Sequence, residues 1–351
     1  MKKVNAMDRA PHIAIVGVTG AVGREFLSVL AQRRFPCCAV RMLASKRSAG
    51  KTVEFKGKSH IIEQLTEDSF KGVDLALFSA GGNISKQFAP IAVETGCTVV
   101  DNSSEFRMND GVPLIVPEVN ADALEASGIA LGSSPGIIAN PNCSTIIMLV
   151  PVTPLHRAAG VRRMVVSTYQ AVSGAGAAAM AELETQTRQV LTGEPPTCTH
   201  FTQQCAFNVF SHDSEVGPQG YNTEELKMVH ETHKIWNDDS PRITATCVRV
   251  PVMRAHAESI NLEFERPMDE KRAVDLLRDA PGVSIIDDRT QNRFPTPLDA
   301  SGRDDVLVGR IRNDLSRNGG PGSGIDLFVC GDQLRKGAAL NAVQIAEMLL
   351  S

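Results

Sequence analysis

One of the eight cysteines stands where a nucleophile could work. Cys143 lies in the sequence PNCST, and the apolar run 146–150 follows, so a turn leads into a predicted helix with the thiol near its N-terminus. The positive end of a helix dipole favours the thiolate, which is the nucleophilic form of cysteine. The other seven cysteines lack such surroundings; Cys97 and Cys247, for example, lie beside or within predicted strands. Cys143 is therefore a candidate nucleophile, with a buried, inert thiol as the alternative.

Two further segments carry groups that a thiol reaction needs. The sequence YQAVSGAG (169–176) ends a long predicted strand in a glycine turn, where backbone can approach a substrate. Arg249 lies on another predicted strand, and His256 follows it. Arginine can hold a carboxylate through two parallel hydrogen bonds, and histidine can transfer protons near neutral pH. A single histidine is more often structural than catalytic, and Glu224 and Lys227 on a predicted helix are typical of a solvated charge pair.

A glycine-rich turn near the N-terminus predicts a dinucleotide site. The apolar run 12–16 is followed by GVTGAVG (17–23) and then by helical periodicity, which is the order that opens a βαβ unit. Glycines let the backbone pass close to a pyrophosphate, and the helix N-terminus supplies N–H donors. A turn of this kind can also serve packing alone. The candidate cofactor-binding residues here are Gly17, Thr19, Gly20, Ala21, Val22 and Gly23.

The segment after the second predicted strand favours NADP over NAD. An NAD site usually carries Asp or Glu here to accept from the ribose 2′-hydroxyl, whereas ASKRSAG (44–50) has no acid. Arg47 could pair with a 2′-phosphate while Ser45 and Ser48 donate hydrogen bonds. A solvated basic loop is the alternative. A second glycine loop, with Ser79 and Gly81, follows the strand expected at 73–78 and should also touch the dinucleotide.

The elements that must position these groups fall into two patterns. Up to Cys143, apolar runs alternate with helical stretches, which predicts a Rossmann-type, doubly wound α/β domain. Beyond it, long strands with helices between them predict an α+β domain with a mainly antiparallel sheet. Strands are expected at 12–16, 39–44, 73–78, 98–101, 129–131, 161–172, 243–252, 256–266, 283–287, 306–311 and 325–329. Helices are expected at 85–95, 177–191, 223–236, 268–279 and 335–350.

Domain boundaries follow from this change of pattern. The dinucleotide-binding domain is expected at 11–142 plus 332–351, and the catalytic and dimerisation domain at 143–331. Pro151 and Pro154 interrupt the run after Cys143, so we expect that helix to be short or kinked. The apolar-faced helix at 177–191 could form a subunit interface or pack inside the second domain.

Composition sets the class of protein. The chain has 351 residues with 36 basic and 40 acidic side chains, a formal charge of −4. There is no basic excess of the kind a nucleic-acid binder carries, and no apolar run approaches the roughly 20 residues that cross a bilayer. The cysteines form no CxxC pair, which is typical of a reduced cytoplasmic protein. His230 and His233 have no acid or thiol ligands nearby, so we expect no metal site.

Together these motifs resemble the aspartate-β-semialdehyde dehydrogenase family. The resemblance spans nearly the whole chain after the first ten residues and keeps the family's order. It rests on VGVTGAVGREF, SKRSAGK, SAGG, DNSSEFRM, PNCST, TYQAVSGAG, EELKMVHETHKI, CVRVPVMRAH and GDQLRKGAALNAVQIAE. The glycine turn is shared with many enzymes, but the cysteine, glutamine and arginine–histidine motifs together are specific.

The resemblance implies roles for individual residues. Cys143 is then the nucleophile, Gln170 orients the intermediate, and His256 is the general acid/base. Arg249 holds the substrate α-carboxylate, and Glu224 its α-amino group. The residues implied for the phosphate or acyl phosphate are Arg107, Asn142 and Lys227. Those implied near the nicotinamide are Ser173, Gly174 and Asn341.

The implied reaction is the reductive dephosphorylation of L-β-aspartyl phosphate to L-aspartate β-semialdehyde through a cysteine thioester. It uses NADP and phosphate, and belongs to the aspartate pathway to lysine, methionine and threonine. A homodimer, or a homotetramer, is also implied. The alternatives are a related acyl-phosphate reductase such as N-acetyl-glutamyl-phosphate reductase, or a non-catalytic nucleotide-binding paralogue. Glu224 disfavours the first, because an acetylated amine does not call for a carboxylate.

Overall fold

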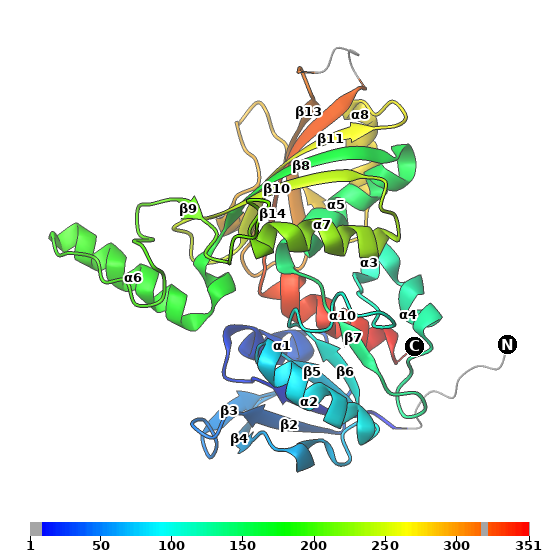
Figure 1. Cartoon of the computed structure of the whole chain (residues 1–351), viewed down its shortest axis with the longest axis vertical. Helices are drawn as coiled ribbons and strands as arrows, with labels where there is room; N and C mark the ends of the chain where they lie inside the picture. Colours follow the sequence, from blue (N-terminus) through cyan, green and yellow to red (C-terminus); the bar gives the residue numbers. More distant parts are fainter. Residues whose placement is uncertain (1–8, 317–321, 351) are drawn as a thin grey trace. The chain divides into compact units, whose positions relative to one another are not determined.

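The computed structural model describes residues 9–316 and 322–350. The chain divides into two compact units: one holds the residues up to Asn142 and those from Ala338 onward, and the other runs from Cys143 to Gly337. Residues 332–337, which were expected in the first domain, lie in the second unit. Each unit is built around its own seven-stranded sheet (Figure 1).

The first unit is a doubly wound sheet, parallel except for one edge hairpin, with strand order β3-β4-β2-β1-β5-β6-β7. The chain leaves β1 toward β2 on one side and later returns to β5 on the other, and such a switch point is where open α/β sheets bind ligands. The strands are β1 (His12–Val16), β2 (Ala39–Ala44), β3 (Thr52–Phe55), β4 (Lys58–Gln64), β5 (Leu75–Phe78), β6 (Thr98–Asp101) and β7 (Ile137–Ala139). The helices are α1 (Ala21–Gln32), α2 (Gly82–Glu94), α3 (Pro117–Asn120), α4 (Asp122–Ser127) and α10 (Leu340–Met348).

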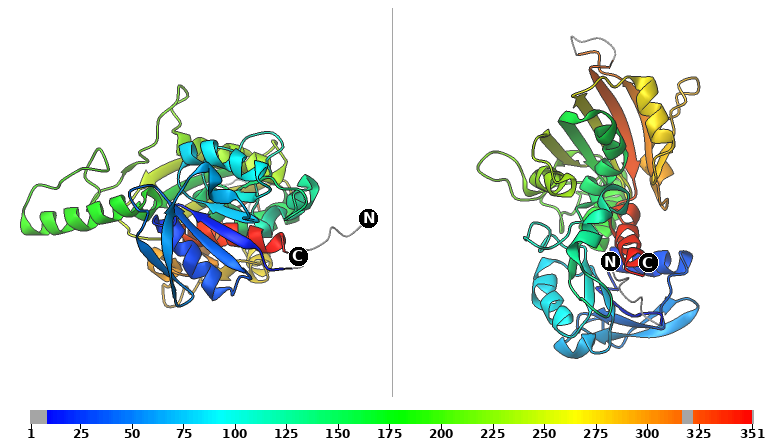
Figure 2. Two further views of the ribbon diagram at one scale, coloured as in Figure 1. Left: turned by 90° about the horizontal axis from the view of Figure 1, so that it is seen from below. Right: turned by 90° about the vertical axis from the view of Figure 1, so that its right-hand side faces the viewer.

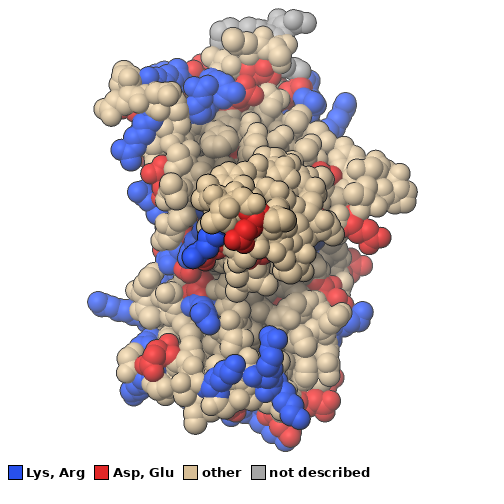
Figure 3. Space-filling view, turned by 90° about the vertical axis from the view of Figure 1, so that its left-hand side faces the viewer, with Lys and Arg blue, Asp and Glu red and all other residues tan. Residues whose placement is uncertain are grey.

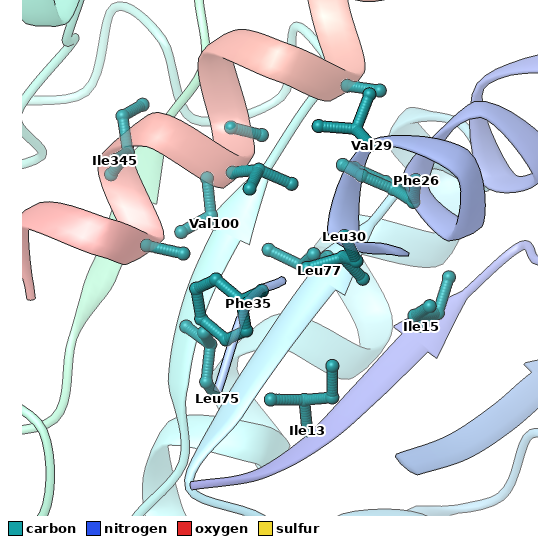
Figure 4. Close-up of a cluster of buried hydrophobic side chains, with 14 of the residues drawn as sticks. Ile13, Ile15, Phe26, Val29, Leu30, Phe35, Leu75, Leu77, Val100 and Ile345 are labelled. Atoms are coloured by element: carbon teal, nitrogen blue, oxygen red, sulfur yellow. The ribbon is translucent and has the colours of Figure 1, made fainter. Parts of the chain in front are cut away.

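Apolar residues on both faces of this sheet explain its layers. Strands β5 and β6 are buried throughout, as expected where helices cover both faces of a parallel sheet. On one face, Ile13 and Ile15 of β1 pack with Phe26 and Leu30 of α1 and with Ile345 of α10 (Figure 4). Helix α2 supplies the apolar cover of the other face. The last helix of the chain is therefore part of the core of the first unit.

The second unit contains a mixed sheet with strand order β12-β13-β14-β11-β8-β10-β9. Only β8 with β10 and β12 with β13 pair in parallel among the described strands of this sheet, so it is mainly antiparallel, as predicted. The strands are β8 (Val161–Gln170), β9 (Phe210–Ser211), β10 (Arg242–Arg249), β11 (His256–Phe264), β12 (Val283–Ile285), β13 (Val306–Asn313) and β14 (Gly324–Gly331). The helices are α5 (Cys143–Ala159), α6 (Ala177–Thr192), α7 (Thr223–Trp236), α8 (Glu270–Arg278) and α9 (Pro297–Ala300).

One face of this sheet carries the candidate site. Helices α5, α7 and α8 lie against it. Side chains alternate between faces along a strand, so Gln170 at the end of β8 and His256 at the start of β11 point to the covered face. Tyr169 precedes Gln170 on β8 and pairs with Ala257 of β11. It points to the opposite face and is 39 % exposed. The covered face thus gathers polar side chains at one end of the sheet.

Helix α6 is anchored at its base and exposed at its far end. Ala179 and Leu183 pack in a cluster with Phe201. Beyond this contact the helix projects from the rest of the second unit (Figure 2). Leu191 is 74 % and Phe207 62 % exposed, and the side from which α6 projects shows a largely uncharged prominence (Figure 3).

Some local predictions are wrong. Residues 129–131 form no strand; Ala130 makes an isolated bridge, and the strand of that region is β7. The hairpin β3–β4 was not predicted. Of the two alternatives given for helix α5, short or kinked, the first is wrong: the helix continues through both of its prolines to Ala159, because its buried packing outweighs the lost backbone hydrogen bonds. The C-terminal helix begins with a π-helical turn, Arg335–Ala339, before α10.

No helix among the described residues combines the length and apolar character needed to span a membrane.

Candidate active site

The candidate nucleophile is the first residue of α5. The backbone N–H groups of a first helical turn have no partner within the helix, so Cys143 lies at its positive end. Gly337 packs directly against it: a Cβ at this glycine would lie 2.8 Å from Cys143 Cβ. Any larger residue would push the thiol from its place. The sequence alone did not reveal Gly337, because this requirement is a contact between distant segments.

His256 presents an N–H to the sulfur. Its Nε2 lies 3.5 Å from Cys143 Sγ, while its Nδ1 accepts a hydrogen bond from the backbone N–H of Ala171 at 3.0 Å. A backbone N–H can only donate, so Nδ1 carries a lone pair and the proton of the neutral ring is on Nε2. The ring is therefore oriented to stabilise a thiolate through a hydrogen bond from Nε2.

The surroundings keep His256 uncharged. Complete burial, and to a smaller extent the positive charge of Arg249, lower its pKa to about 3, although Glu224 opposes this shift. The ring is thus neutral at physiological pH in the form that the Ala171 contact selects. A negative charge that develops beside Nε2 during a reaction would favour the protonated ring and so raise this pKa.

Backbone strain adjoins the histidine. Ala255 has φ of 71°, a left-handed conformation that is costly for a residue with a Cβ. The side chain of Gln333 fixes it, since Oε1 accepts from the Ala255 N–H at 2.8 Å and Nε2 donates to Ser173 Oγ. These bonds connect the loop before β11 with the glycine turn after β8 and so help to hold His256 in position.

A hydrogen-bonded network continues from the end of β8. Gln170 Nε2 donates to Ser144 Oγ at 2.7 Å and to Glu224 Oε1 at 3.1 Å. Glu224 Oε2 accepts from Lys227 Nζ at 3.1 Å. Both carboxylate oxygens are therefore engaged, and the Glu224 side chain is only 7 % exposed. The pair Glu224–Lys227 is not the solvated charge pair that its spacing alone would indicate.

Arg249 lies beside Gln170 in the parallel register of β10 and β8. Its guanidinium is buried, and Nη1 donates to the Ala171 carbonyl oxygen at 3.0 Å. Gly174 borders both this group and the histidine: a Cβ there would lie 3.2 Å from His256 Cε1 and 3.6 Å from Arg249 Nη1. The missing side chain leaves room over the histidine ring where a substrate could lie.

The other buried thiols lack these features. Burial raises the pKa of Cys205 to about 11 and raises the pKa of Cys97, Cys247 and Cys330 further still. They remain protonated, and a protonated thiol is a poor nucleophile. This contrast supports Cys143 as the reactive cysteine.

Glu258 forms a second polar layer beneath the site. It lies two residues after His256 on the same face of β11, opposite Thr168 of β8, and it is fully buried. Neither carboxyl oxygen has a hydrogen-bond partner among the described residues. Burial raises its pKa well above the usual range, so the acid is neutral in the folded protein.

We expect the stability of Glu258→Gln to fall less with rising pH than the stability of the wild type. Between the ordinary pKa of a glutamate and the raised one, the folded protein holds a proton that the unfolded chain has lost. Stability then falls as pH rises, by about 1.4 kcal/mol per pH unit for one proton. The amide cannot titrate, so the variant should lose less stability from pH 5 to 8 in urea unfolding. An unchanged slope would show that Glu258 is already ionised.

In the first unit, the glycine turn is shaped by close backbone approach. A Cβ at Gly17 would lie 2.2 Å from the Ser79 carbonyl oxygen, and one at Gly23 would lie 2.2 Å from the Gly17 oxygen. These contacts tie the turn after β1 to the loop after β5, where Ser79 and Gly81 lie. Gly20 has more space, its nearest neighbour being 3.4 Å away. Thr19 and Gly20 precede helix α1, and Ala21 and Val22 are its first residues. The helix N-terminus that they form lies at this loop, and such an N-terminus suits a dinucleotide phosphate.

The loop after β2 offers cationic and hydroxyl groups beside this turn. Ser45 and Arg47 are exposed, and Ser48 is buried. Arg47 has no ion pair within the part of the chain that the structure describes. A cleft of about 690 Å³ lies here; besides Thr19 and Ser48, its lining includes two cations that the sequence analysis had not selected, Arg24 and Lys51.

Three further candidates lie in the first unit. Arg107 is buried, with Nε donating to the Asn140 carbonyl at 2.9 Å and Nη2 to the Asn102 carbonyl at 2.8 Å. Asn341 of α10 donates from Nδ2 to Asn140 Oδ1 at 2.7 Å and to a backbone carbonyl. Asn142, also buried, directly precedes Cys143 in the chain. The structure thus assembles Cys143, Gln170, Ser173, Gly174, Glu224, Lys227, Arg249 and His256 in one unit and the other candidates in the other.

The fold and these groups define an oxidoreductase of the semialdehyde dehydrogenase class. The family described as "Semialdehyde dehydrogenase, NAD binding domain" matches residues 12–127, and "Semialdehyde dehydrogenase, dimerisation domain" matches residues 152–336. An aspartate-semialdehyde dehydrogenase from Synechocystis sp. is 51 % identical over 97 % of each chain, and one from Aquifex aeolicus is 49 % identical. The crystal structure of aspartate semialdehyde dehydrogenase II complexed with ASA from Vibrio cholerae superposes with a TM-score of 0.92, at 47 % identity, over 97 % of this chain and 98 % of that one.

The chain belongs to the aspartate-semialdehyde dehydrogenase family. The family resemblance and the two-domain α/β fold predicted from the sequence are therefore confirmed, and nothing in the comparisons favours an acetyl-glutamyl-phosphate reductase or a silent paralogue. Membership makes the chain an aldehyde-acting oxidoreductase with a nicotinamide cofactor.

Proposed function

We propose that the chain interconverts L-β-aspartyl phosphate and L-aspartate β-semialdehyde, using NADP and phosphate, with Cys143 as the nucleophile. The observation that carries this proposal is the contact of Cys143 Sγ with the Nε2–H of His256, whose other nitrogen is held by Ala171. A thiolate stabilised by a hydrogen-bond donor at close range is what an acyl-transfer step through sulfur requires.

In the biosynthetic direction, the sulfur of Cys143 attacks the β-acyl carbon and phosphate leaves, which forms a thioester. A nicotinamide bound here would supply the hydride that turns this thioester into a tetrahedral oxyanion. The Nε2–H of His256 donates a hydrogen bond first to this oxyanion and then to the departing sulfur, and collapse of the oxyanion releases the aldehyde and the thiolate. Gln170 orients the acyl group through its amide, which Ser144 and Glu224 already fix in place.

The charges of the substrate have matching partners. Arg249 offers the planar fork that binds a carboxylate, and Glu224 complements an ammonium. We propose that the phosphate of the substrate binds to the side chains of Lys227, Arg107 and Asn142. We assign the cofactor to the glycine turn after β1, the loop after β2 and the loop after β5 in the first unit. Ser173, Gly174 and Asn341 are assigned to its nicotinamide end.

A direct assay tests the function. Purified protein is mixed with aspartate semialdehyde and NADP, with and without phosphate, and NADPH is followed by absorbance. We expect NADPH formation that depends on phosphate, because phosphate must release the acyl group from sulfur. Replacing the substrate with N-acetyl-glutamate semialdehyde provides the contrasting arm. Turnover of that compound alone would overturn the proposal.

We expect Arg47→Ala to weaken NADP binding roughly tenfold or more while NAD binding changes little. In this variant the 2′-phosphate of NADP loses a charge-assisted hydrogen bond, whereas NAD has no phosphate at that position and loses none. Dissociation constants for both cofactors are measured by fluorescence titration. Lys58→Ala, which removes an exposed cation from β4, is the matched control. Equal losses for both cofactors would indicate a general charge effect and remove Arg47 from the 2′-phosphate site.

The second unit supports assembly into a homodimer, which can pair further into a tetramer. The match to a dimerisation domain supports self-association of residues 152–336. Two surfaces fit this purpose: the sheet face that carries Tyr169, and the surface of α6 and the segment after it, which expose the apolar Leu191 and Phe207 respectively. Sedimentation equilibrium distinguishes monomer, dimer and tetramer.

A further inference from the structure

Arg249, to which the proposed function assigns the substrate carboxylate, is already engaged by groups of its own chain. Nη2 donates to His212 Nε2 at 2.9 Å and to Asp213 Oδ1 at 2.9 Å, and Nη1 donates to Ala171 O at 3.0 Å. The Arg249 side chain is 3 % exposed. Its buried Nε has no hydrogen-bond partner among the described residues.

These contacts block two-bond recognition of another carboxylate. A guanidinium presents two forks, Nε with Nη2 and Nη1 with Nη2, and both include Nη2. Nη2 has two hydrogens, and in this structure it also has two acceptors, His212 and Asp213. A substrate carboxylate can complete a fork only after one of these acceptors leaves. The unpartnered Nε–H indicates the fork that such a carboxylate would complete with Nη2.

Of the two acceptors, His212 is held more firmly. Its backbone N–H donates to the Cys247 carbonyl at 2.9 Å, and its Nδ1 lies 3.1 Å from Ser214 Oγ. Burial lowers the pKa of His212, so the ring stays neutral. Arginine can only donate, so Nε2 carries the lone pair that accepts from Arg249 at 2.9 Å, and the ring proton is on Nδ1, where Ser214 Oγ accepts it; the Ser214 N–H, 3.2 Å from Nδ1, is the longer contact.

Asp213 is free to exchange. Its side chain is 34 % exposed, so water can take over its hydrogen bonds when it moves. Partial burial disfavours its charge, but the hydrogen bond and charge of Arg249 prevail and lower its pKa. Asp213 therefore stays ionised, and an arriving carboxylate would both repel it and replace it at the guanidinium.

We propose that Asp213 is a specificity-determining residue that occupies Arg249 in the empty site and competes with the substrate carboxylate for it. The inference rests on the proposed function, because it requires Arg249 to bind the α-carboxylate. Exchange of one carboxylate for another keeps the buried guanidinium neutralised throughout. An aldehyde without a carboxylate has nothing to exchange and leaves the Arg249–Asp213 pair intact.

The test is Asp213→Asn, which keeps the shape of the side chain and removes its charge. We expect KM for aspartate semialdehyde to fall about twofold to fivefold, the upper part of the range that exposed ion pairs show. The kcat/KM for 3-aminopropanal, which is the same aldehyde without its carboxylate, should stay at the wild-type value. Asp239→Asn, at a carboxylate that is 95 % exposed, is the matched control and should leave both values unchanged.

Three outcomes overturn the competition. They are an unchanged KM for aspartate semialdehyde, a raised KM, and equal changes for both aldehydes; the second would indicate that Asp213 helps to bind the substrate. Arg249→Lys separates this failure from a failure of the proposed function. If Arg249 binds the carboxylate, that variant raises KM for aspartate semialdehyde strongly, and adding Asp213→Asn to it no longer lowers KM. No effect of Arg249→Lys would place the carboxylate elsewhere.

Discussion

Cys143→Ala is expected to abolish phosphate-dependent NADPH formation, with a loss on the order of 10⁴-fold or more in kcat. Without sulfur no thioester can form, and no other thiol can replace it, because the buried cysteines of the second unit have raised pKa values and stay protonated. Binding of NADPH should remain nearly intact, since the glycine turn lies in the first unit. Stopped-flow absorbance gives the rate, and fluorescence titration gives the affinity.

The matched control for this variant is Cys205→Ala, which removes a fully buried thiol of the same unit. Its kcat should stay near that of the wild type, although a small loss of thermal stability is expected from the cavity. A pre-steady-state burst of NADPH in the wild type, absent in Cys143→Ala, would identify the acyl-transfer intermediate. Substantial residual turnover in Cys143→Ala would remove Cys143 from the chemistry.

The elements with strong local signals could be predicted from the sequence. The apolar runs of β1 and β5, the glycine turn and the helix that begins at Cys143 each depend on neighbouring residues, so periodicity and helix-start signals suffice. The hairpin β3–β4 was missed because its strands are short and mostly exposed, with little apolar alternation. Helix α5 was expected to be short because proline is unfavourable in isolated helices, and burial overrides that local penalty.

Much of the site is invisible to local patterns because it is made of backbone atoms and distant contacts. The Ala171 N–H that selects the tautomer of His256 has no side-chain signature. Gly337 matters only because Cys143 lies against it. Asp213 is one acidic residue among many until folding brings it to Arg249. Each of these depends on the long-range register of the second sheet, which sequence periodicity does not specify.

His256→Asn and His256→Gln together test the direction in which the histidine works. An Asn amide oxygen can take the place of Nδ1 and keep the Ala171 N–H satisfied, but it leaves no donor near the sulfur. A Gln amide nitrogen can take the place of Nε2 and keep the donor, but it leaves the Ala171 N–H without the acceptor that fixes the side chain. We expect kcat to fall roughly 10²- to 10⁴-fold in both, with the larger loss in His256→Asn, and KM to change less.

The same variants also have a readout in stability, which tests whether the folded protein keeps the ring neutral. The pKa of His256 is lowered to about 3, so between that value and the ordinary 6.5 the unfolded chain binds a proton that the folded protein does not. Stability of the wild type therefore rises with pH across this window and is lost on acidification. Neither amide titrates, so both variants should lose less stability than the wild type between pH 7 and 4 in urea unfolding. If His256→Asn keeps wild-type kcat, the reaction does not need the Nε2–H donor beside the sulfur. If the slopes of all three proteins agree, the ring is not held neutral by burial and Arg249.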